Sequence, residues 1–364
     1  MKKLIPLSLL ILLFFSCKKE GDNIIWERSI GQGNAFFIGL AQDSGILSCG
    51  MLSGNPYLVK FNKGRNFEVD YASGREGLFS SAWSDTSGFI AAGSSDGNML
   101  ITRIDRTGSM VWDTTITAGF YLDISSLVYE GSGIFLAVGS ASPDSSDNGD
   151  TGILFVRFDI TGQITKKMET TSTETGFVAA NNASEDGSGN IYLPLTRKNG
   201  SLKPKATIAK YNKSIQKLWE TELYNNPGFT AACYDAVPDG SGNVYVTGRM
   251  EASNMSGTLN NSYLVCLTRL GEVSWKKYLE NSNSGSSVLL SESGGVIMLN
   301  RNCFIFRKAN KNDGSDAGII RMFSACDSYT TDAFGTDMDL NYDGNLLVAG
   351  SKGGNFYIAL KSSQ

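Results

Sequence analysis

A short apolar strand that usually ends in glycine recurs seven times along the chain, and this repeat limits the possible folds more than any other feature. The copies are ILSCG ending at Gly50, FIAAG at Gly93, FLAVG at Gly139, IYLPL at Leu195, VYVTG at Gly248, VIMLN at Asn300 and LLVAG at Gly350. Successive copies lie roughly 50 residues apart, a spacing typical of structural repeats that stack on one another. A repeat architecture is therefore the first expectation.

Each repeat contains further strand signals around this apolar strand. A turn such as TSG or GSGN precedes most copies, and glycine supplies the positive φ that such turns need. Another strand follows, and then a turn and a strand that often carries tryptophan, as in Asn98–Trp112. One more strand, such as LFSSAWSD, lies ahead of the first turn. The pattern predicts four antiparallel strands per repeat and an all-β fold.

Seven such units predict a seven-bladed β-propeller of four-stranded antiparallel blades. Because each blade hides its faces only by stacking on neighbours, we expect the array to close into a ring. The last repeat stops at its third strand, while a spare strand, Asn23–Gly31, opens the mature chain. We expect Ile24–Ile30 to pair alongside Phe356–Leu360, so that residues 24–364 form a single domain. An eight-bladed ring or an open solenoid is the alternative.

Two segments resemble a known repeat. RIDRTGSMVWDTT from Arg103 and RLGEVSWKKY from Arg269 are similar to the acid–glycine–tryptophan docking pattern of pyrroloquinoline-quinone-type, or quinoprotein-like, propeller repeats. The resemblance implies that tryptophan packs between adjacent blades. That role would fall to Trp26, Trp112, Trp219 and Trp275. The third repeat departs from the pattern, with Thr165 or Lys166 where tryptophan belongs. The resemblance implies a packing role and no catalytic one.

The N-terminus predicts export and lipid attachment. Lys2 and Lys3 precede an apolar run, Leu4–Phe15, that is too short to span a membrane. Residues 1–16 therefore read as a signal peptide. The segment FFSC resembles the lipobox of bacterial lipoproteins, which implies that Cys17 is acylated, for example with palmitate, and that residues 17–23 carry the lipid and form a tether.

Lys18 follows the lipidated cysteine where an inner-membrane retention signal would place Asp, so the expected destination is the outer membrane. Whether the protein faces the periplasm or the cell surface stays open. An ordinary secretory signal or an uncleaved anchor is the alternative to the lipoprotein.

Composition removes several classes of function. The net charge of −4 gives no electrostatic case for nucleic-acid binding. The chain has no histidine, which excludes Ser-His-Asp and Cys-His nucleophiles and nearly every zinc site that uses histidine. We expect no cofactor and no metal. Cys49, Cys233 and Cys266 read as small buried hydrophobic residues. Cys303 and Cys326 form a candidate disulfide in an oxidising compartment.

Carboxylates offer two candidate sites, each with a simpler explanation. Asp144, Asp147 and Asp150 in one loop, and Asp313 and Asp316 in another, provide oxygen ligands for calcium, although the spacing favours solvated loops. The predicted inner strands carry acids that could flank a glycosidic bond, or could instead cap strand ends and turns. These acids are Asp85, Asp123, Asp235, Asp337 and Asp339.

The loops of one face offer a binding surface. Three consecutive repeats have long connections at Ser140–Gly152, Thr196–Ala206 and Arg249–Ser262, and loops on rigid scaffolds commonly bind ligands. An aromatic residue also recurs where the inner strand begins. These candidate binding residues, which could instead pack between blades, are Phe37, Phe79, Tyr121, Phe177, Phe229 and Phe334.

Two functions from different classes follow. The favoured one is a membrane-anchored, non-enzymatic propeller lipoprotein that binds a protein or glycan partner through its loop face. The alternative is an enzyme, either a carboxylate-based glycan hydrolase or lyase, or a quinone-dependent dehydrogenase. Three of the named acids within reach of one another in a deep channel would favour the hydrolase, whereas serine, asparagine and aromatic residues at the channel mouth would favour binding.

Overall fold

The structure is a computed structural model, and it describes most of the chain after the N-terminal segment. The described residues are 23–117, 121–142, 152–171, 177–198, 203–224, 229–254, 257–279, 284–291, 294–302, 304–323 and 333–363. Within them lie 28 β-strands, grouped in six sheets whose pairs are all antiparallel. Cys17 and the proposed Cys303–Cys326 pair fall outside these residues.

The largest sheet has seven strands and joins the two ends of the chain. In spatial order its strands are β26 (Ala333–Leu340), β27 (Leu346–Lys352), β28 (Asn355–Lys361), β1 (Ile24–Leu40), β2 (Ile46–Leu52), β3 (Asn55–Phe61) and β4 (Phe67–Ala72).

Four sheets have four strands each, in chain order. They consist of β5 (Gly77–Ser84), β6 (Gly88–Ser95), β7 (Asn98–Asp105) and β8 (Met110–Ile116); β9 (Tyr121–Gly131), β10 (Ile134–Ser142), β11 (Gly152–Asp159) and β12 (Ile164–Thr171); β18 (Phe229–Pro238), β19 (Val244–Asn254), β20 (Gly257–Leu267) and β21 (Val273–Leu279); and β22 (Gly285–Leu290), β23 (Gly295–Asn300), β24 (Ile305–Asn310) and β25 (Asp316–Arg321).

The remaining sheet has five strands because its first strand is broken in two. Its members are β13 (Phe177–Ala180), β14 (Ser184–Glu185), β15 (Ile191–Lys198), β16 (Lys205–Tyr211) and β17 (Lys217–Glu222). Both short pieces, β13 and β14, pair with β15. Together they take the place that one longer strand has in the other sheets.

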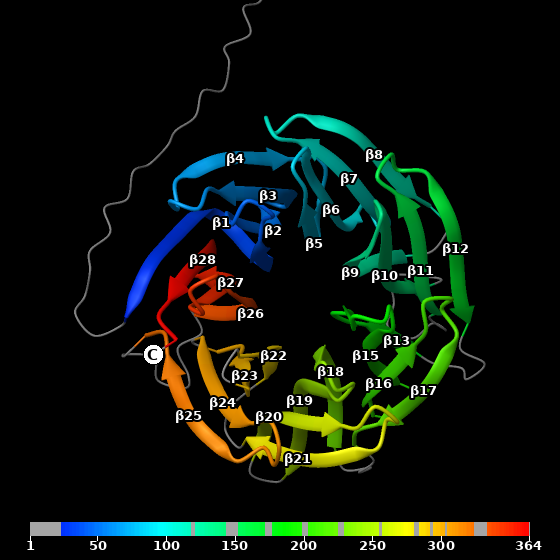
Figure 1. Cartoon of the computed structure of the whole chain (residues 1–364), viewed down its shortest axis with the longest axis vertical. Coiled ribbons are helices and arrows are strands. Elements are labelled where there is room, and N and C mark those ends of the chain that lie inside the picture. Colours follow the sequence, from blue (N-terminus) through cyan, green and yellow to red (C-terminus); the bar gives the residue numbers. More distant parts are fainter. Residues whose placement is uncertain are drawn as a thin grey trace, which may run out of the picture.

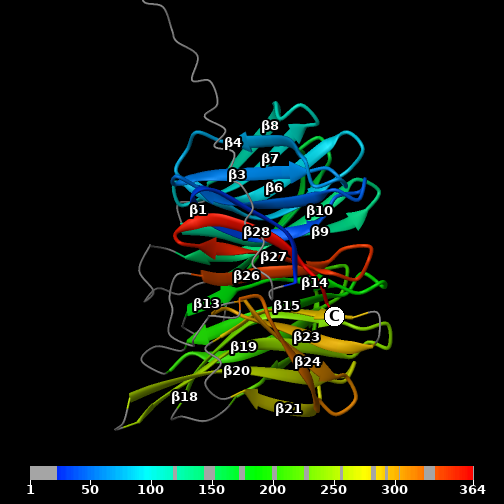
Figure 2. The same cartoon turned by 90° about the vertical axis from the view of Figure 1, so that its left-hand side faces the viewer.

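The sheets stand radially around a central axis. Figure 1 shows the first strand of each sheet near the middle and the last at the rim, and Figure 2 shows the same stack from the side. Strand β1 runs from the rim of the ring to the axis. Its first part, Ile24–Gln32, pairs with β28 at the rim, and its second part, Gly33–Leu40, pairs with β2 near the axis. The predicted pairing of Ile24–Ile30 with the last strand is therefore present, with Trp26 opposite Leu360.

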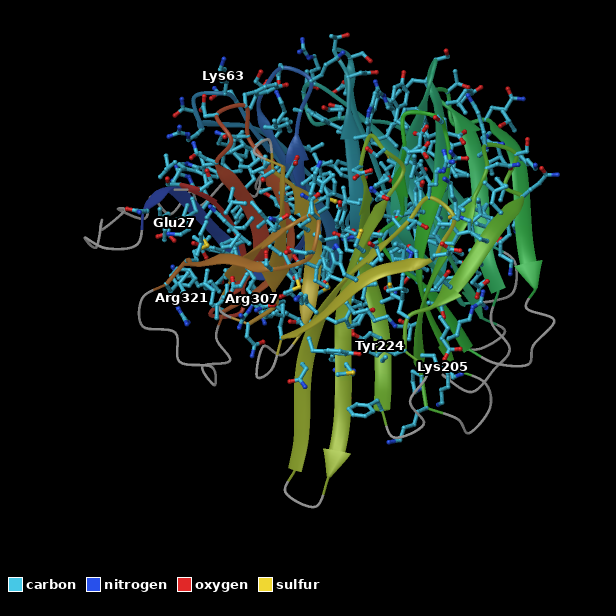
Figure 3. The ribbon with its side chains drawn as sticks, turned by 60° about the horizontal axis from the view of Figure 1, so that its bottom comes forward. Glu27, Lys63, Lys205, Tyr224, Arg307 and Arg321 are labelled. Carbon is cyan, nitrogen blue, oxygen red and sulfur yellow. The ribbon has the colours of Figure 1, made fainter. Side chains whose placement is uncertain are left out.

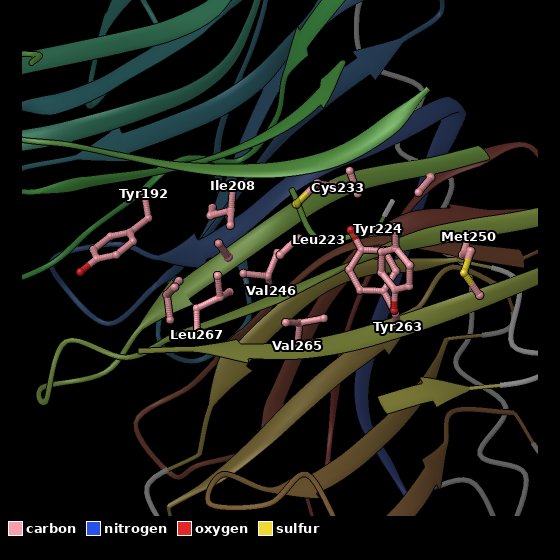
Figure 4. Packing of buried hydrophobic residues seen from close by; sticks show 14 residues of the cluster. Tyr192, Ile208, Leu223, Tyr224, Cys233, Val246, Met250, Tyr263, Val265 and Leu267 are labelled. Carbon is pink, nitrogen blue, oxygen red and sulfur yellow. The ribbon is translucent and has the colours of Figure 1, made fainter. Parts of the chain in front are cut away.

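Buried apolar residues of the described chain gather in clusters between neighbouring sheets. One cluster joins Tyr192 and Ile208 of the five-stranded sheet to Val246 and Val265 of the next sheet (Figure 4). Another lies between the two halves of the seven-stranded sheet, where Tyr57 of β3 meets Phe356 of β28 at a ring-centroid distance of 5.4 Å. Stacking of sheet on sheet thus supplies the apolar burial that stabilises the fold.

Three tryptophans of the outer strands contact the next sheet, as the sequence pattern predicted. Trp112 Nε1 donates to the Ile160 carbonyl at 3.2 Å, and Trp219 Nε1 donates to that of Arg269 at 3.1 Å. A Cβ on Gly271 would lie 2.7 Å from the Trp219 ring, so glycine makes room for the indole. Trp275 repeats this contact on Lys311, and Trp26 packs edge-on against Phe61 of β3.

The third repeat lacks this tryptophan, and a buried side chain from the turn of the next sheet packs there instead. Lys166 occupies the register of the tryptophans, opposite Arg157. The turn of the next sheet then has Ile215, buried, where the turns facing Trp112 and Trp219 have glycine. Ile215 has φ +64°, a conformation that costs a β-branched residue energy. Its side chain packs in the cluster between the two sheets.

One predicted loop is a strand extension. The segment Arg249–Ser262 continues the β19–β20 ladder, with Arg249 opposite Ser262 and Asn254 opposite Gly257. β18 accompanies it as far as Phe229, which pairs with Ala252. This three-stranded arm projects beyond the rest of the ring, on the same side as Lys205 and Tyr224 (Figure 3).

Candidate functional site

The innermost strand of almost every sheet has one extra residue without a partner on the next strand. In β1, Ala35 pairs with Gly50 and Phe37 pairs with Cys49, so Phe36 is left out of the ladder. Such β-bulges bend a strand and redirect a side chain. The bulged residues are Phe36, Ser80, Ser125, Tyr234, Ser286 and Thr336. In the five-stranded sheet, Asn181–Ala183 interrupt the strand at the same place.

The glycine that ends most copies of the repeated strand faces this irregularity. A Cβ on Gly93 would lie 2.0 Å from the carbonyl oxygen of Leu78, and one on Gly350 would lie 2.0 Å from that of Phe334. Only glycine allows two backbones to approach so closely. Where Asn300 replaces it, the partner on the inner strand is Gly285. The repeated glycine therefore marks the point at which the inner strand bulges.

Polar side chains at four of these positions, Ser80, Ser125, Asn181 and Thr336, link one inner strand to the next. Ser80 Oγ donates to the Ile124 carbonyl, and Ser125 Oγ lies 3.1 Å from the Asn181 carbonyl. Asn181 Nδ2 donates in turn to the carbonyl of Cys233 at 2.5 Å. Thr336 Oγ1 donates to the Ala35 carbonyl at 2.6 Å, across the junction of the two chain ends. These bonds satisfy the carbonyls that the bulges release from the ladders.

A cavity of about 320 Å³ lies where these inner strands converge. Every sheet contributes to it, and most of its lining is hydroxyl, amide or aromatic. The lining residues are Phe36, Leu78, Ser80, Ile124, Ser125, Asn181, Asn182, Tyr234, Ser284, Ser286, Arg301, Gly335 and Thr336. Its size is at the low end of ligand-binding pockets, so it suits a small ligand or one terminal group of a larger one.

Arg301 is the charged residue of this lining. Its backbone is held from two sides, because its N–H donates to the Ser284 carbonyl at 2.7 Å and its carbonyl accepts from the Gly335 N–H at 2.7 Å. The guanidinium carbon lies 5.1 Å from the centre of the Phe334 ring. Ser284 precedes β22 and Arg301 follows β23, so both belong to the loop face of the ring.

Two carboxylates are buried beside the cavity without lining it. Ser287 Oγ lies 2.9 Å from Asp235 Oδ2 and 3.1 Å from Asp337 Oδ1. Asp235 also accepts the Val288 N–H at 2.7 Å, and Asp337 accepts the Ile38 N–H at 3.0 Å. Burial, with a contribution from the charge of Asp337, raises the pKa of Asp235 to about 8. Burial, with the charge of Asp339, raises the pKa of Asp337 to about 7.

The other predicted acids whose side chains are described have different hydrogen-bond partners. Asp85 pairs with Arg103 at 2.9 Å, and although burial opposes it, bonds from Ser87 and Arg103 lower the pKa of Asp85. Asp339 accepts the N–H of Leu40 at 3.3 Å. Asp313 accepts the Ser315 N–H within its own turn. The side chain of Asp123 and the loop with Asp144, Asp147 and Asp150 lie outside the described residues. Within the described ranges no three Cys, Asp or Glu side chains could hold a metal ion.

The predicted aromatic ring is not gathered around the cavity in the part of the chain that the structure describes. Phe79 is fully buried, and Phe37 packs in the same cluster between β1–β4 and β5–β8. Phe229 packs against the cluster of Figure 4. Phe334 lies under Arg301, at the edge of the cavity. The side chains of Tyr121 and Phe177 lie outside the described residues, so their binding role stays a prediction.

The described cysteines are buried and unpaired, namely Cys49, Cys233 and Cys266. Burial raises the pKa of each thiol, which keeps it protonated and unreactive. Among the residues with described positions, none belongs to a helix of the length and hydropathy that a membrane span requires.

Solved structures with similar folds include a streptogramin B lyase, at 9% identity and a TM-score of 0.59, with 92% of this chain and 98% of that chain covered. Another is the β-propeller domain of Cps50 (Swd1) from Myceliophteria thermophila, at 11% identity and a TM-score of 0.55, with 92% and 99% covered. A protein of unknown function from Bacteroides caccae aligns at 14% identity and a TM-score of 0.46, over 72% and 82%. No family model matches the chain, and no curated protein matches it.

At these identities the likeness concerns the fold alone. The chain has a β-propeller fold. The radial sheets are therefore blades of a propeller, and the cavity lies in its central channel.

The bulged residues and Arg301 were not among the predicted site residues. The signal for the bulges was present in the sequence as the repeated glycine, but a glycine indicates close backbone approach without indicating which strand approaches. Arg301 directly follows VIMLN, one of the two copies in which another residue replaces the glycine.

Proposed function

We propose that this protein is a membrane-anchored, non-enzymatic binding protein whose central cavity receives a glycan or protein partner at the loop face. The observation that carries the proposal is the cavity itself, in which hydroxyls, amides and the aromatic side chains of Phe36 and Tyr234 converge from every blade. Such a lining offers both hydrogen-bond donors and acceptors and apolar surface, which is what a sugar ring requires. The small volume favours one terminal sugar over an extended polymer.

The enzymatic alternative has a specific observation on its side, the close approach of Asp235 and Asp337. However, both carboxylates accept backbone N–H groups of the neighbouring blades and neither lines the cavity. A glycosidase needs its two carboxyl groups on either side of the bond that it cleaves. The binding function therefore fits the geometry better than a hydrolase or lyase. The resemblance to quinoprotein-like repeats rests on the tryptophans. Their contacts support a packing role only, and so give no support to a quinone-dependent dehydrogenase.

We also infer that the ring has seven blades and is closed by β1. The two halves of the seven-stranded sheet pack face to face in the cluster of Tyr57 and Phe356, as separate blades do elsewhere. When those halves are counted as two blades, they and the other five sheets make seven. The rim part of β1 would then complete the last blade, where Glu27 Oε2 accepts the Tyr357 hydroxyl at 2.6 Å.

The anchor is proposed from the sequence. Cys17 would be acylated after cleavage of residues 1–16, and the domain of residues 24–364 would be held at the outer membrane by the tether between them. A Cys17→Ala variant should lose acyl labelling and become soluble in cell fractionation. Acyl labelling of that variant, or its persistence in the membrane, would contradict the lipoprotein proposal.

The binding function is tested by filling the cavity. Ser286 lines it, and its Oγ makes one long contact of 3.4 Å with the Leu299 carbonyl, so Ser286→Tyr should occupy the cavity at small structural cost. The matched control is Ser29→Tyr, on the exposed rim of β1. With thermal melting as the check on folding, Ser286→Tyr should abolish binding on a glycan panel and Ser29→Tyr should retain it.

Affinity capture with the same variants tests whether the partner is a protein. A protein partner lost with Ser286→Tyr and kept with Ser29→Tyr supports cavity binding. Ligands that bind both variants equally would rule out the cavity as the binding site. Cleavage of a panel glycan by the wild type, lost in Asp235→Asn, would instead establish the hydrolase or lyase.

A further inference from the structure

The central cavity has an unbalanced positive charge. Arg301 is exposed, and no carboxylate of the described residues forms an ion pair with it. The other lining residues are uncharged. Asp235 and Asp337, the nearby buried acids, bind Ser287 and backbone N–H groups instead. An anionic group that enters the cavity therefore meets one guanidinium and no competing acid among these residues.

The guanidinium is positioned before any ligand arrives. The backbone bonds to Ser284 and Gly335 fix the start of the side chain, and the face of Phe334 lies 5.1 Å from the guanidinium carbon. An arginine on an aromatic face loses less conformational entropy when it binds. Its planar N–H groups match the two oxygens of a carboxylate.

The hydroxyls of the bulges have a defined polarity. Ser80, Ser125 and Thr336 direct their protons to backbone carbonyls. Each hydroxyl has a single proton, so these oxygens offer only lone pairs to the cavity. A ligand must supply the donors for these three oxygens, as the hydroxyl groups of a sugar do. The lining thus combines acceptors for hydroxyl groups with one site for an anion.

We propose that the cavity selects a sugar residue that carries a carboxylate, with the carboxylate on Arg301 and the sugar hydroxyls donating to Ser80, Ser125 and Thr336. This inference rests on the proposed binding function and specifies its ligand. A uronic acid at the end of a glycan has the required groups on a single ring. The neutral sugar of the same shape would keep the hydroxyl contacts and lose the ion pair.

The test compares methyl β-D-glucuronide with methyl β-D-glucoside by NMR titration at low salt. The wild type should bind the glucuronide more tightly by about tenfold or more, since hydrogen bonds to charged groups are stronger than neutral ones. Arg301→Gln should weaken binding of the glucuronide until the two dissociation constants lie within about twofold of each other. The control Arg106→Gln, on the exposed turn between β7 and β8, should keep the wild-type preference.

The outcomes separate this inference from the function on which it rests. Equal binding of both glycosides by the wild type, or a preference that survives Arg301→Gln, would overturn the inference. The proposed function would still hold if Ser286→Tyr removes binding. If no panel glycan and no captured partner shows binding that Ser286→Tyr removes, the proposed function itself fails. A preference for the glucuronide that persists in Ser286→Tyr would place the anion site outside the cavity and also overturn the inference.

Discussion

Asp235 and Asp337 come from the inner strands of two blades that are not neighbours, and both contact the hydroxyl of Ser287, which lies on the blade between them. The hydroxyl has one proton and can donate it to only one carboxylate at a time. The second contact is favourable when the other carboxyl group is itself protonated and donates to Ser287. Three blades are thus joined through a group whose bonding depends on protonation.

This arrangement predicts that stability falls as pH rises from 5 to 8. The pKa of Asp235 is raised from 3.8 to about 8 and that of Asp337 to about 7, so the folded chain keeps protons that the unfolded chain has released. The contribution of these carboxyl groups to the free energy of unfolding is complete below their pKa in the unfolded chain. It is lost as pH rises through their pKa values in the folded chain. Asp337→Asn should make the loss of unfolding free energy between pH 5 and 8 smaller by about 1.4 kcal/mol or more, the equivalent of one pKa unit.

Urea unfolding at both pH values measures this difference, with Asp343→Asn, in an exposed turn, as the control. The asparagine at position 337 keeps an acceptor for the Ile38 N–H, so the fold should survive the change. A variant whose pH dependence equals that of the wild type would show that the pair is ionised throughout this range.

The repeated glycine predicts a large local cost of substitution. A Cβ on Gly93 would lie 2.0 Å from a carbonyl oxygen, so Gly93→Ala must push two strands apart beside the bulge at Ser80. We expect a loss of about 1–3 kcal/mol in the free energy of unfolding, as for other overpacked interiors. A Cβ on Gly187 would meet no atom within 4 Å, so Gly187→Ala serves as the control, with an expected change within about 0.5 kcal/mol. Similar losses for both variants would disprove the close-approach explanation.

Ile215 and Lys166 should be energetically coupled. Ile215→Gly relieves the positive φ but empties a buried site, and Lys166→Trp alone places an indole against the isoleucine. The double variant recreates the tryptophan-on-glycine contact of Trp219 and Gly271, so it should be more stable than the sum of the single changes by at least about 0.5 kcal/mol. Chemical unfolding of all four proteins gives the coupling energy. Strict additivity would mean that the two positions do not share one packing site.

The rim part of β1 should be necessary for a stable ring. A chain that begins at Gly33 exposes the edge of β28 and loses the contacts of Trp26 and Glu27. We expect it to melt at least about 5 °C lower and to associate through the open edge. The comparison is with a chain that begins at Asn23, by calorimetry and light scattering. Equal melting of two monomeric proteins would contradict closure by β1.

The predictions from sequence succeeded where the signal was local and repeated. Alternating apolar residues and Gly-containing turns were sufficient to predict the strands, and the incomplete last repeat predicted the pairing of Ile24–Ile30 with β28. The tryptophan contacts followed from a residue pattern. The long loop expected at Arg249–Ser262 is an exception, because a polar segment continues a β-ladder whenever both strands extend together.

The sequence by itself determined the strands, the turns and the order of the blades, because each depends on residues a few positions apart. Only the tertiary structure decided what lies at the axis. Asp235, Ser287 and Asp337 are about 50 residues apart in succession, as are the bulged residues that line the cavity, and no local pattern relates them. They meet because every inner strand runs along the same channel, and that convergence exists only once the blades are arranged in a ring.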